Sequence, residues 1–297
     1  MTEATAELGS SAAPASGVRA APAPLSSPTG DLIRLLVLFL VAGVVLVPLL
    51  LTALGGFKSL GELRTTLFFP NEWHWQNYWD ILSSWRYWEV LFNSTFISGV
   101  TVILTLALAA PAAFAFAHLH FFGEKFLFNY LILGLTFPFA TAILPLFIKV
   151  RDLGLLDSHW GVIWPQVAFH QAISVLLFRN AFRSIPHELL ESALVDGCGY
   201  MRFFFWITLP LSGPILATVS VITFVQSWNN FLLPLVVLNT DSEYPWPLGL
   251  MAYQGEYMTA WNLVLAFITL TILPAILMFI FAQKYIVAGL TAGAVKG

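Results

Sequence analysis

Charged side chains are scarce in this sequence. Asp, Glu, Lys and Arg together make up 10% of its 297 residues, whereas an ordinary soluble domain carries about 25%. Hydrophobic residues make up 58% of the chain, and its mean hydropathy is +0.81. The shortage of charge excludes an ordinary soluble domain and indicates an integral membrane protein.

Cysteine and runs of basic residues are also lacking. Cys198 is the only cysteine, so the chain cannot form an internal disulfide, and no set of Cys and His residues has the spacing of a structural zinc site. The formal net charge is −3 and no basic run is present, which gives no electrostatic basis for nucleic-acid binding. We therefore expect neither a metal site nor a nucleic-acid partner.

The first 30 residues contain few large apolar side chains. They are rich in Ala, Pro and Ser, and such a composition cannot bury enough surface to offset the entropy of ordering. Glu3 and Glu7 stand where a secretory signal would carry basic residues, and no apolar run follows before residue 31. We expect a disordered tail over residues 1–30 and one transmembrane domain over residues 31–297.

Six long apolar runs follow this tail. Each is long enough for a helix to cross the hydrocarbon core, which takes about 20 residues, and too continuous for a strand of a membrane barrel. The sequence therefore predicts an all-α, polytopic membrane protein with six transmembrane helices. The runs cover residues 32–54, 91–117, 126–148, 160–182, 214–238 and 261–281.

Lys and Arg indicate how these spans are oriented. Arg179, Arg183 and Lys284 lie close to span ends, where the preference of positive residues for the cytoplasmic side is strongest. The bias favours cytoplasmic N- and C-termini. The loop of about residues 183–210, between the fourth and fifth spans, is then predicted to be cytoplasmic.

This loop is predicted to contain a short polar helix. Glu188 and Glu191 fall in its early turns, where the helix dipole favours negative charge, and Gly197 is the residue type that most easily adopts a left-handed cap. Taken alone, Glu191 is better explained as a solvated surface charge on an amphipathic helix. The helix is too short to span a membrane, so we expect it to contact something soluble.

The loop resembles the EAA signature of permease subunits of binding-protein-dependent ABC importers. The signature consists of Glu followed by two small residues, then Gly, then an Ile-x-Leu-Pro ending. These residues occur here at the spacing of that signature, although Ser192 stands where Ala is usual. The resemblance implies the MetI-like permease fold, with this loop coupling the chain to an ATPase. The residues that it assigns to coupling are Glu191, Ser192, Ala193, Asp196, Gly197, Ile207, Leu209 and Pro210.

Further segments resemble the carbohydrate permeases related to the maltose importer, in particular its MalG-like subunit. The resemblance implies a permease, not an enzyme, that moves a sugar or oligosaccharide across the cytoplasmic membrane of a bacterium or archaeon. It implies a second permease as heterodimer partner, two ATPase subunits that bind ATP and Mg²⁺, an extracytoplasmic sugar-binding protein, and no cofactor on this chain. The segments are 75–78, 182–186, 227–231 and 289–297.

Polar side chains within the spans are candidates for the path of a substrate. Gln166 and His170 are four residues apart on one helical face, and Gln226 and Asn230 are spaced in the same way. Neutral donors, acceptors and an aromatic face suit a neutral sugar, but the same groups could instead bond neighbouring helices. The candidates are Asn93, Gln166, His170, Gln226, Trp228, Asn229 and Asn230.

Three other functions remain open from the sequence. The solute could be a polyol phosphate, or the chain could be an ATP-independent carrier or a membrane enzyme. The sequence disfavours the last two, because no carboxylate lies near the centre of a span and no intramembrane catalytic cluster stands out. The identity of the sugar cannot be read from these residues.

Overall fold

The computed structural model describes residues 28–65, 68–253 and 259–294, and these residues form helices joined by turns. The chain divides between Pro48 and Leu49 into two compact units, which are considered separately. The tail predicted over residues 1–30 lies outside the described residues, except for 28–30, which begin the first helix.

The first predicted span is a single helix, α1 (Pro28–Gly56). Its most apolar stretch has its side chains unburied, and Asp31 and Arg34 near its start form an ion pair of 3.7 Å. A helix that is apolar on all sides is suited to a membrane span.

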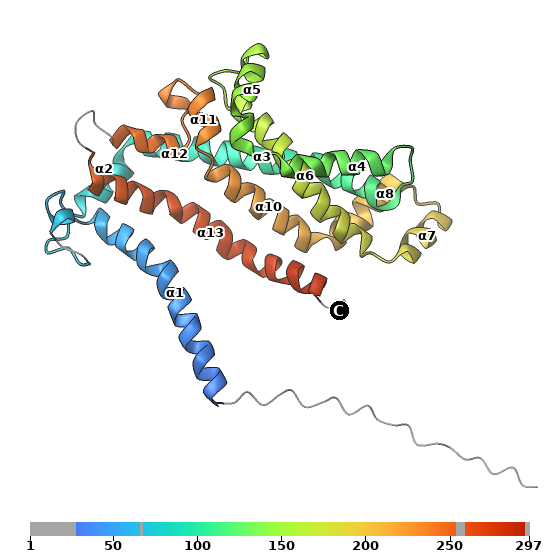
Figure 1. Ribbon diagram of the computed structural model, residues 1–297, viewed down its shortest axis with the longest axis horizontal. Helices are drawn as coiled ribbons and strands as arrows, with labels where there is room; N and C mark the ends of the chain where they lie inside the picture. Colours follow the sequence, from blue (N-terminus) through green and yellow to red (C-terminus); the bar gives the residue numbers. More distant parts are fainter. Residues whose placement is uncertain (1–27, 66–67, 254–258, 295–297) are drawn as a thin grey trace, which may run out of the picture. The chain divides into compact units, whose positions relative to one another are not determined.

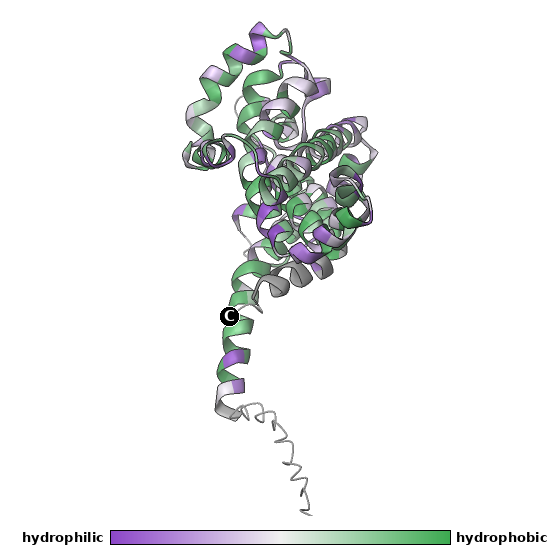
Figure 2. Ribbon diagram, turned by 90° about the vertical axis from the view of Figure 1, so that its right-hand side faces the viewer, coloured by the Kyte–Doolittle hydropathy of each residue, from purple (hydrophilic) through white to green (hydrophobic). Residues whose placement is uncertain are grey.

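Four long helices form the centre of the larger unit. These are α3 (Trp85–His118), α6 (His159–Arg183), α10 (Gly213–Trp228) and α13 (Trp261–Ala294). Helix α3 packs along α6, and α10 packs against both α3 and α13 (Figure 1). Hydrophobic residues cover most of these helices (Figure 2), as lipid requires.

One face of helix α3 is buried in the bundle. Ala109, Ala110 and Ala113 are buried in the same cluster as Phe178 and Phe182 of α6. Small side chains let two helix backbones approach closely in a membrane. The alanines of the second span therefore explain why α3 and α6 are the most closely associated pair.

The third predicted span is sharply bent, and the expectation of a continuous helix over 126–148 is wrong. The segment consists of α4 (Glu124–Leu133), η2 (Gly134–Thr136) and α5 (Phe139–Asp152), and its two parts meet at 106°. Phe137 is extended, with φ −85° and ψ 118°. The cause is Pro138, because proline disfavours helical backbone at the residue before it.

The fifth predicted span also differs from the expected helix over 214–238. Helix α10 ends at Trp228, and a separate short helix, α11 (Leu232–Val237), follows after residues 229–231. Pro234 accounts for the break, since its ring would clash with the carbonyl of Asn230, four residues earlier, in a continuous helix. At the other end, α10 is bent by 78° from the preceding helical segment, residues 200–211.

Short elements connect these helices. The segment Trp75–Tyr78 closes the end of α1, since Asn77 Nδ2 donates to the carbonyls of Gly56 and Lys58 at 2.9 and 3.0 Å. Helix α2 packs against α13 and the start of α3. The connecting elements are η1 (Glu62–Arg64), α2 (Gln76–Ser83), α7 (His187–Val195), α8 (Tyr200–Phe203), η3 (Phe204–Thr208), α9 (Leu209–Leu211), η4 (Asp241–Glu243), α12 (Trp246–Gly249) and η5 (Leu250–Tyr253).

Candidate functional site

The short helix predicted in the 183–210 loop is α7. It begins at His187 with Pro186 as its N-cap. Ser184 lies outside α7 and closes α6, because its hydroxyl donates to the carbonyl of Ala181 at 2.7 Å. Pro186 disfavours helical backbone at Ile185, the residue before it, which separates α7 from α6.

One face of α7 is anchored in the hydrophobic core. Leu190 and Ala193 are buried against Phe182, Phe203 and Phe204. Leu189 and Leu194 are also apolar, but their exposed fractions are 43% and 37%. Residues three apart share a stripe of the helix surface, so burial of Leu190 and Ala193 turns the flanking leucines outward.

The opposite face of α7 is open and combines charged with apolar groups. The side chain of Glu191 is 68% exposed, and its Oε1 lies 3.1 Å from Nδ1 of His187. Ser192 and Asp196 are exposed, and Val195 is 88% exposed. An exposed apolar side chain beside carboxylates is typical of a surface that contacts another protein.

Gly197 ends α7 in a left-handed turn, as its residue type predicts. Its φ is +76°. The N–H of Gly197 donates to the carbonyl of Leu194 at 3.0 Å, and the N–H of Cys198 donates to that of Ala193 at 2.8 Å. These two bonds define a Schellman motif, in which the left-handed residue is usually glycine.

The end of the loop turns back into the bundle. Ile207 and Leu209 are partly buried against the same core cluster as Leu190, and Pro210 is exposed. The eight residues assigned by resemblance therefore form two groups. Ala193, Ile207 and Leu209 face inward, and the exposed group comprises Glu191, Ser192, Asp196, Gly197 and Pro210.

A second candidate site is a pocket of about 420 Å³ at the bend of the third span. It contains four of the residues that the sequence proposed for the substrate path, namely Gln166 and His170 of α6, Gln226 of α10, and Asn230. Gly134, Leu135 and Phe137 from the bend line it together with Phe139, Phe169 and Ile173. The residues of the bend were not foreseen as part of a site, although Pro138 marked its position.

Two buried side chains in this pocket have polar atoms without a hydrogen-bond partner among the described residues. Gln166 is 1% exposed, and neither its Oε1 nor its Nε2 has a hydrogen-bond partner among the described residues. Within the same part of the chain, Nδ1 of His170 is also unpaired. Asn230 uses its Oδ1 to accept the N–H of Leu233 at 3.2 Å, which caps α11.

The three other path candidates lie outside the pocket and have structural contacts. Asn93 Nδ2 donates to the carbonyls of Ser242 and Tyr244 at 2.7 and 3.1 Å. The carbonyl of Trp228 accepts from Trp246 Nε1 at 2.7 Å, and Asn229 Nδ2 donates to the carbonyl of Val225 at 2.8 Å. The contacts of Asn93 and of the Trp228 carbonyl join neighbouring segments, whereas the contact of Asn229 stays at the end of α10.

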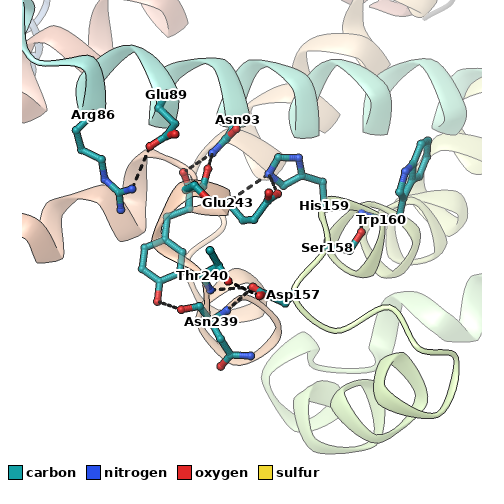
Figure 3. A network of polar contacts seen from close by, with 12 residues as sticks. Arg86, Glu89, Asn93, Asp157, Ser158, His159, Trp160, Asn239, Thr240 and Glu243 are labelled. Carbon is teal, nitrogen blue, oxygen red and sulfur yellow. Dashed lines mark hydrogen bonds and ion pairs between the residues drawn. The ribbon is translucent and has the colours of Figure 1, made fainter.

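Asn93 belongs to a polar network at the end of the bundle where α3 and α6 begin (Figure 3). Asp157 accepts the backbone N–H groups of Asn239 and Thr240 and the hydroxyl of Thr240. The Thr240 hydroxyl is the main cause that holds the pKa of Asp157 below its usual value. Nε2 of His159 lies 3.0 Å from Oε2 of Glu243. The segment 239–244 is therefore held by several polar contacts.

The described residues contain no group of three or more His, Cys, Asp or Glu side chains that could hold a metal ion. The two sites thus consist of a mixed surface on α7 and a neutral polar pocket.

Comparison with known proteins agrees with this geometry. Residues 106–291 match the family model of the binding-protein-dependent transport system inner membrane component. The arabinooligosaccharides transport system permease protein AraQ of Halalkalibacterium halodurans is 36% identical over 86% of this chain and 93% of its own length. The diacetylchitobiose uptake system permease protein NgcG of Streptomyces coelicolor is 34% identical over 84% of each chain.

A solved structure shares the fold. A chain of a bacterial ABC transporter involved in the import of the acidic polysaccharide alginate superposes with a TM-score of 0.76 and 22% identity, covering 89% of this chain and 100% of that chain. The matched family model covers more than half of the present chain, including the 183–210 loop and the pocket residues of α6 and α10. The chain belongs to the family of binding-protein-dependent transport system inner membrane components, the permeases of ABC importers.

Proposed function

We propose that this chain is the permease subunit of an ABC importer that moves a sugar or an oligosaccharide across the cytoplasmic membrane of a bacterium or archaeon. A second permease completes the pathway as a heterodimer partner, and an extracytoplasmic binding protein delivers the sugar. Two ATPase subunits bind ATP and Mg²⁺ and carry out hydrolysis. The chain itself binds no cofactor and breaks no bond.

The geometry of α7 is the observation that carries the coupling role. Its inner face is fixed to the core through Leu190 and Ala193, while Glu191, Asp196 and Val195 face outward. A force applied to the outer face is therefore transmitted to the cluster that contains α3 and α6. Coupling of this kind requires two packed states whose balance the partners shift.

The orientation follows from the same role. ATP is available in the cytoplasm, so the 183–210 loop faces that side and the segment 239–244 faces outward. Arg179 Nε, near the end of α6, donates to the carbonyl of Phe116, near the end of α3, at 3.0 Å. This hydrogen bond supports placing the two helix ends on the same side of the membrane. The N- and C-termini are then cytoplasmic, provided that each bent helix pair crosses the membrane once.

The relatives and the pocket both support a saccharide as cargo. Relatives at least 30% identical include permeases named for arabinooligosaccharides, diacetylchitobiose and sulfoquinovosyl glycerol. The described residues that line the pocket include no Asp, Glu, Lys or Arg. This composition favours a neutral sugar over a polyol phosphate, which usually binds Arg, Lys or a helix N-terminus.

The test is ATP hydrolysis by the complete importer in proteoliposomes. We expect the sugar-loaded binding protein to stimulate hydrolysis by the wild type, and Glu191→Ala to reduce the stimulated rate about tenfold, a usual size for coupling between sites. Val195→Asp should weaken copurification of the ATPase subunits, because it introduces a charge into the apolar part of the surface.

Glu188→Ala is the matched control. Glu188 is an exposed carboxylate on the same helix but lies outside the signature, so this variant should retain stimulation. Unchanged hydrolysis in both Glu191→Ala and Val195→Asp, with the complex still assembled, would refute the coupling role of α7.

A further inference from the structure

We propose that the pocket at the bend of the third span is a subsite for one neutral sugar ring, so that this chain binds part of the cargo and does more than form a wall of the pathway. The inference rests on the proposed function of sugar import. It adds a specific location, defined by Gln166, His170, Gln226 and Asn230, and a chemical class of ligand.

Two interrupted helices meet at this pocket. Gly134, Leu135 and Phe137 belong to the bend between α4 and α5, and Asn230 lies in the break between α10 and α11. Non-helical backbone at membrane depth is tolerated where protein buries it or where it lines a water-filled cavity. Broken helices of this kind commonly form the substrate sites of membrane transporters. The position is therefore one at which a hydrated solute can be held.

The polar groups of α6 require a partner in this pocket. Gln166 is 1% exposed and both of its side-chain polar atoms are unpaired within the described chain. Leaving a buried amide group without a hydrogen bond costs on the order of 1–3 kcal/mol, and such groups in native proteins are nearly always paired with protein, water or ligand. We assign that partner to the hydroxyl groups of a sugar bound in the pocket.

The arrangement of these groups matches a sugar ring. Gln166 and His170 lie one helical turn apart on α6, and Gln226 enters from α10. An amide offers both donors and acceptors, as does a neutral imidazole, and sugar hydroxyls need both. Phe139 and Phe169, with ring centroids 4.9 Å apart, supply an apolar wall for the C–H groups of the ring.

The size of the pocket is also suitable. Its volume of about 420 Å³ lies within the range of roughly 300–1,000 Å³ that is usual for small-molecule sites. One ring with its hydroxyl groups, rather than a long oligosaccharide, is the unit that such a pocket holds. The remainder of a longer cargo would extend toward the second permease.

The experiment measures uptake by the complete importer in proteoliposomes, with its binding protein and radiolabelled arabinotriose, diacetylchitobiose or raffinose. For the sugar that the wild type accumulates, we expect Gln166→Leu and Gln226→Leu each to raise the transport KM about tenfold, which is the loss of one or two hydrogen bonds. ATP hydrolysis stimulated by the loaded binding protein should be retained, since α7 is untouched.

Gln171→Leu is the matched control. Gln171 lies on the same helix and its Nε2 is also unpaired among the described residues, but it does not line the pocket. Its substitution should leave KM unchanged. Gln166→Leu should not lower the melting temperature of the complex, because an apolar side chain replaces an unsatisfied amide.

The outcomes separate this proposal from the proposed function. If the wild type takes up a sugar but Gln166→Leu and Gln226→Leu transport it with the wild-type KM, the subsite is refuted and sugar import stands. If the wild type accumulates no sugar that its binding protein binds, and no such sugar stimulates hydrolysis, sugar import itself is refuted, and the subsite with it.

Discussion

At the scale of single residues, a few positions set the local backbone that the rest of the fold uses. Gly197 adopts φ +76° at the end of α7, and Asp157 adopts φ +54° before α6. The first is a glycine, for which this region has no steric cost. The second is an aspartate, a residue type that tolerates left-handed backbone and can bond neighbouring amides.

Gly197→Ala should destabilise the protein by about 1 kcal/mol, the cost of a Cβ in left-handed backbone. A Cβ at this position would meet nothing within 4 Å, so the loss would come from the backbone alone. Gly213→Ala is the control, because its Cβ is also unobstructed and the residue begins a regular helix. Thermal unfolding of the purified protein measures both, and equal melting temperatures would contradict the expectation.

Asp157 should make stability depend on pH. Its hydrogen bonds, chiefly from the Thr240 hydroxyl, lower the folded-state pKa below 3.8. The stabilisation that these hydrogen bonds provide is therefore present above the unfolded-state pKa of Asp157 and is lost as pH falls through its folded-state pKa. Melting curves from about pH 7 to about pH 3 should show the advantage of the wild type over Asp157→Asn shrinking at the acidic end. A difference in melting temperature that stays constant with pH would contradict this prediction.

At the scale of elements, the packing of α7 decides which of its residues face a partner. Leu190 is 2% exposed, whereas Val195 on the same helix is 88% exposed. Both are apolar, and their separation by five residues places them on different faces of a helix. The packed face holds α7 against the bundle, and the open face remains available for contact.

Leu190→Ala should cost roughly 2–5 kcal/mol, because it removes a core side chain and leaves a cavity. Val195→Ala should change stability by no more than about 0.5 kcal/mol, as is usual for surface sites. Thermal unfolding of the two variants compares them directly. Similar losses in both would mean that α7 does not pack as described.

At the scale of the whole molecule, hydrogen bonds and ion pairs indicate which loops lie at the same end of the bundle. Arg179 joins the end of α6 to the end of α3 through the carbonyl of Phe116. Asn93 and His159 bind the segment 239–244 where these helices begin. Phe122 and Val195 therefore belong to one end, and Asn239 belongs to the other.

Cysteine labelling tests this topology. In a Cys198→Ser background, Phe122→Cys and Val195→Cys should react with an impermeant maleimide only in inverted vesicles, whereas Asn239→Cys should react in intact spheroplasts. All three side chains are exposed in the described chain, so access depends on the membrane and not on burial. Reaction of Val195→Cys and Asn239→Cys from the same side would contradict six crossings.

Much of this protein could be predicted from local patterns. The apolar runs predicted the long helices because satisfying backbone groups in lipid leaves few alternatives, and Gly197 predicted its own left-handed turn because only its missing Cβ matters there. The angle of the bend at Pro138 and the length of the break before Pro234 could not be predicted in this way. Those depend on which neighbouring segments fill the space beside the proline.

Sequence alone thus determined the class of membrane protein, the number of apolar segments and the position of the α7 turn, since these follow from composition and short-range backbone sterics. Tertiary structure alone decided that Leu190 rather than Leu189 anchors α7, and that Gln166, His170, Gln226 and Asn230 share a pocket from which Asn93, Trp228 and Asn229 are absent. The physical reason is that burial and pairing depend on which helices pack together, and residues from distant segments set that packing jointly.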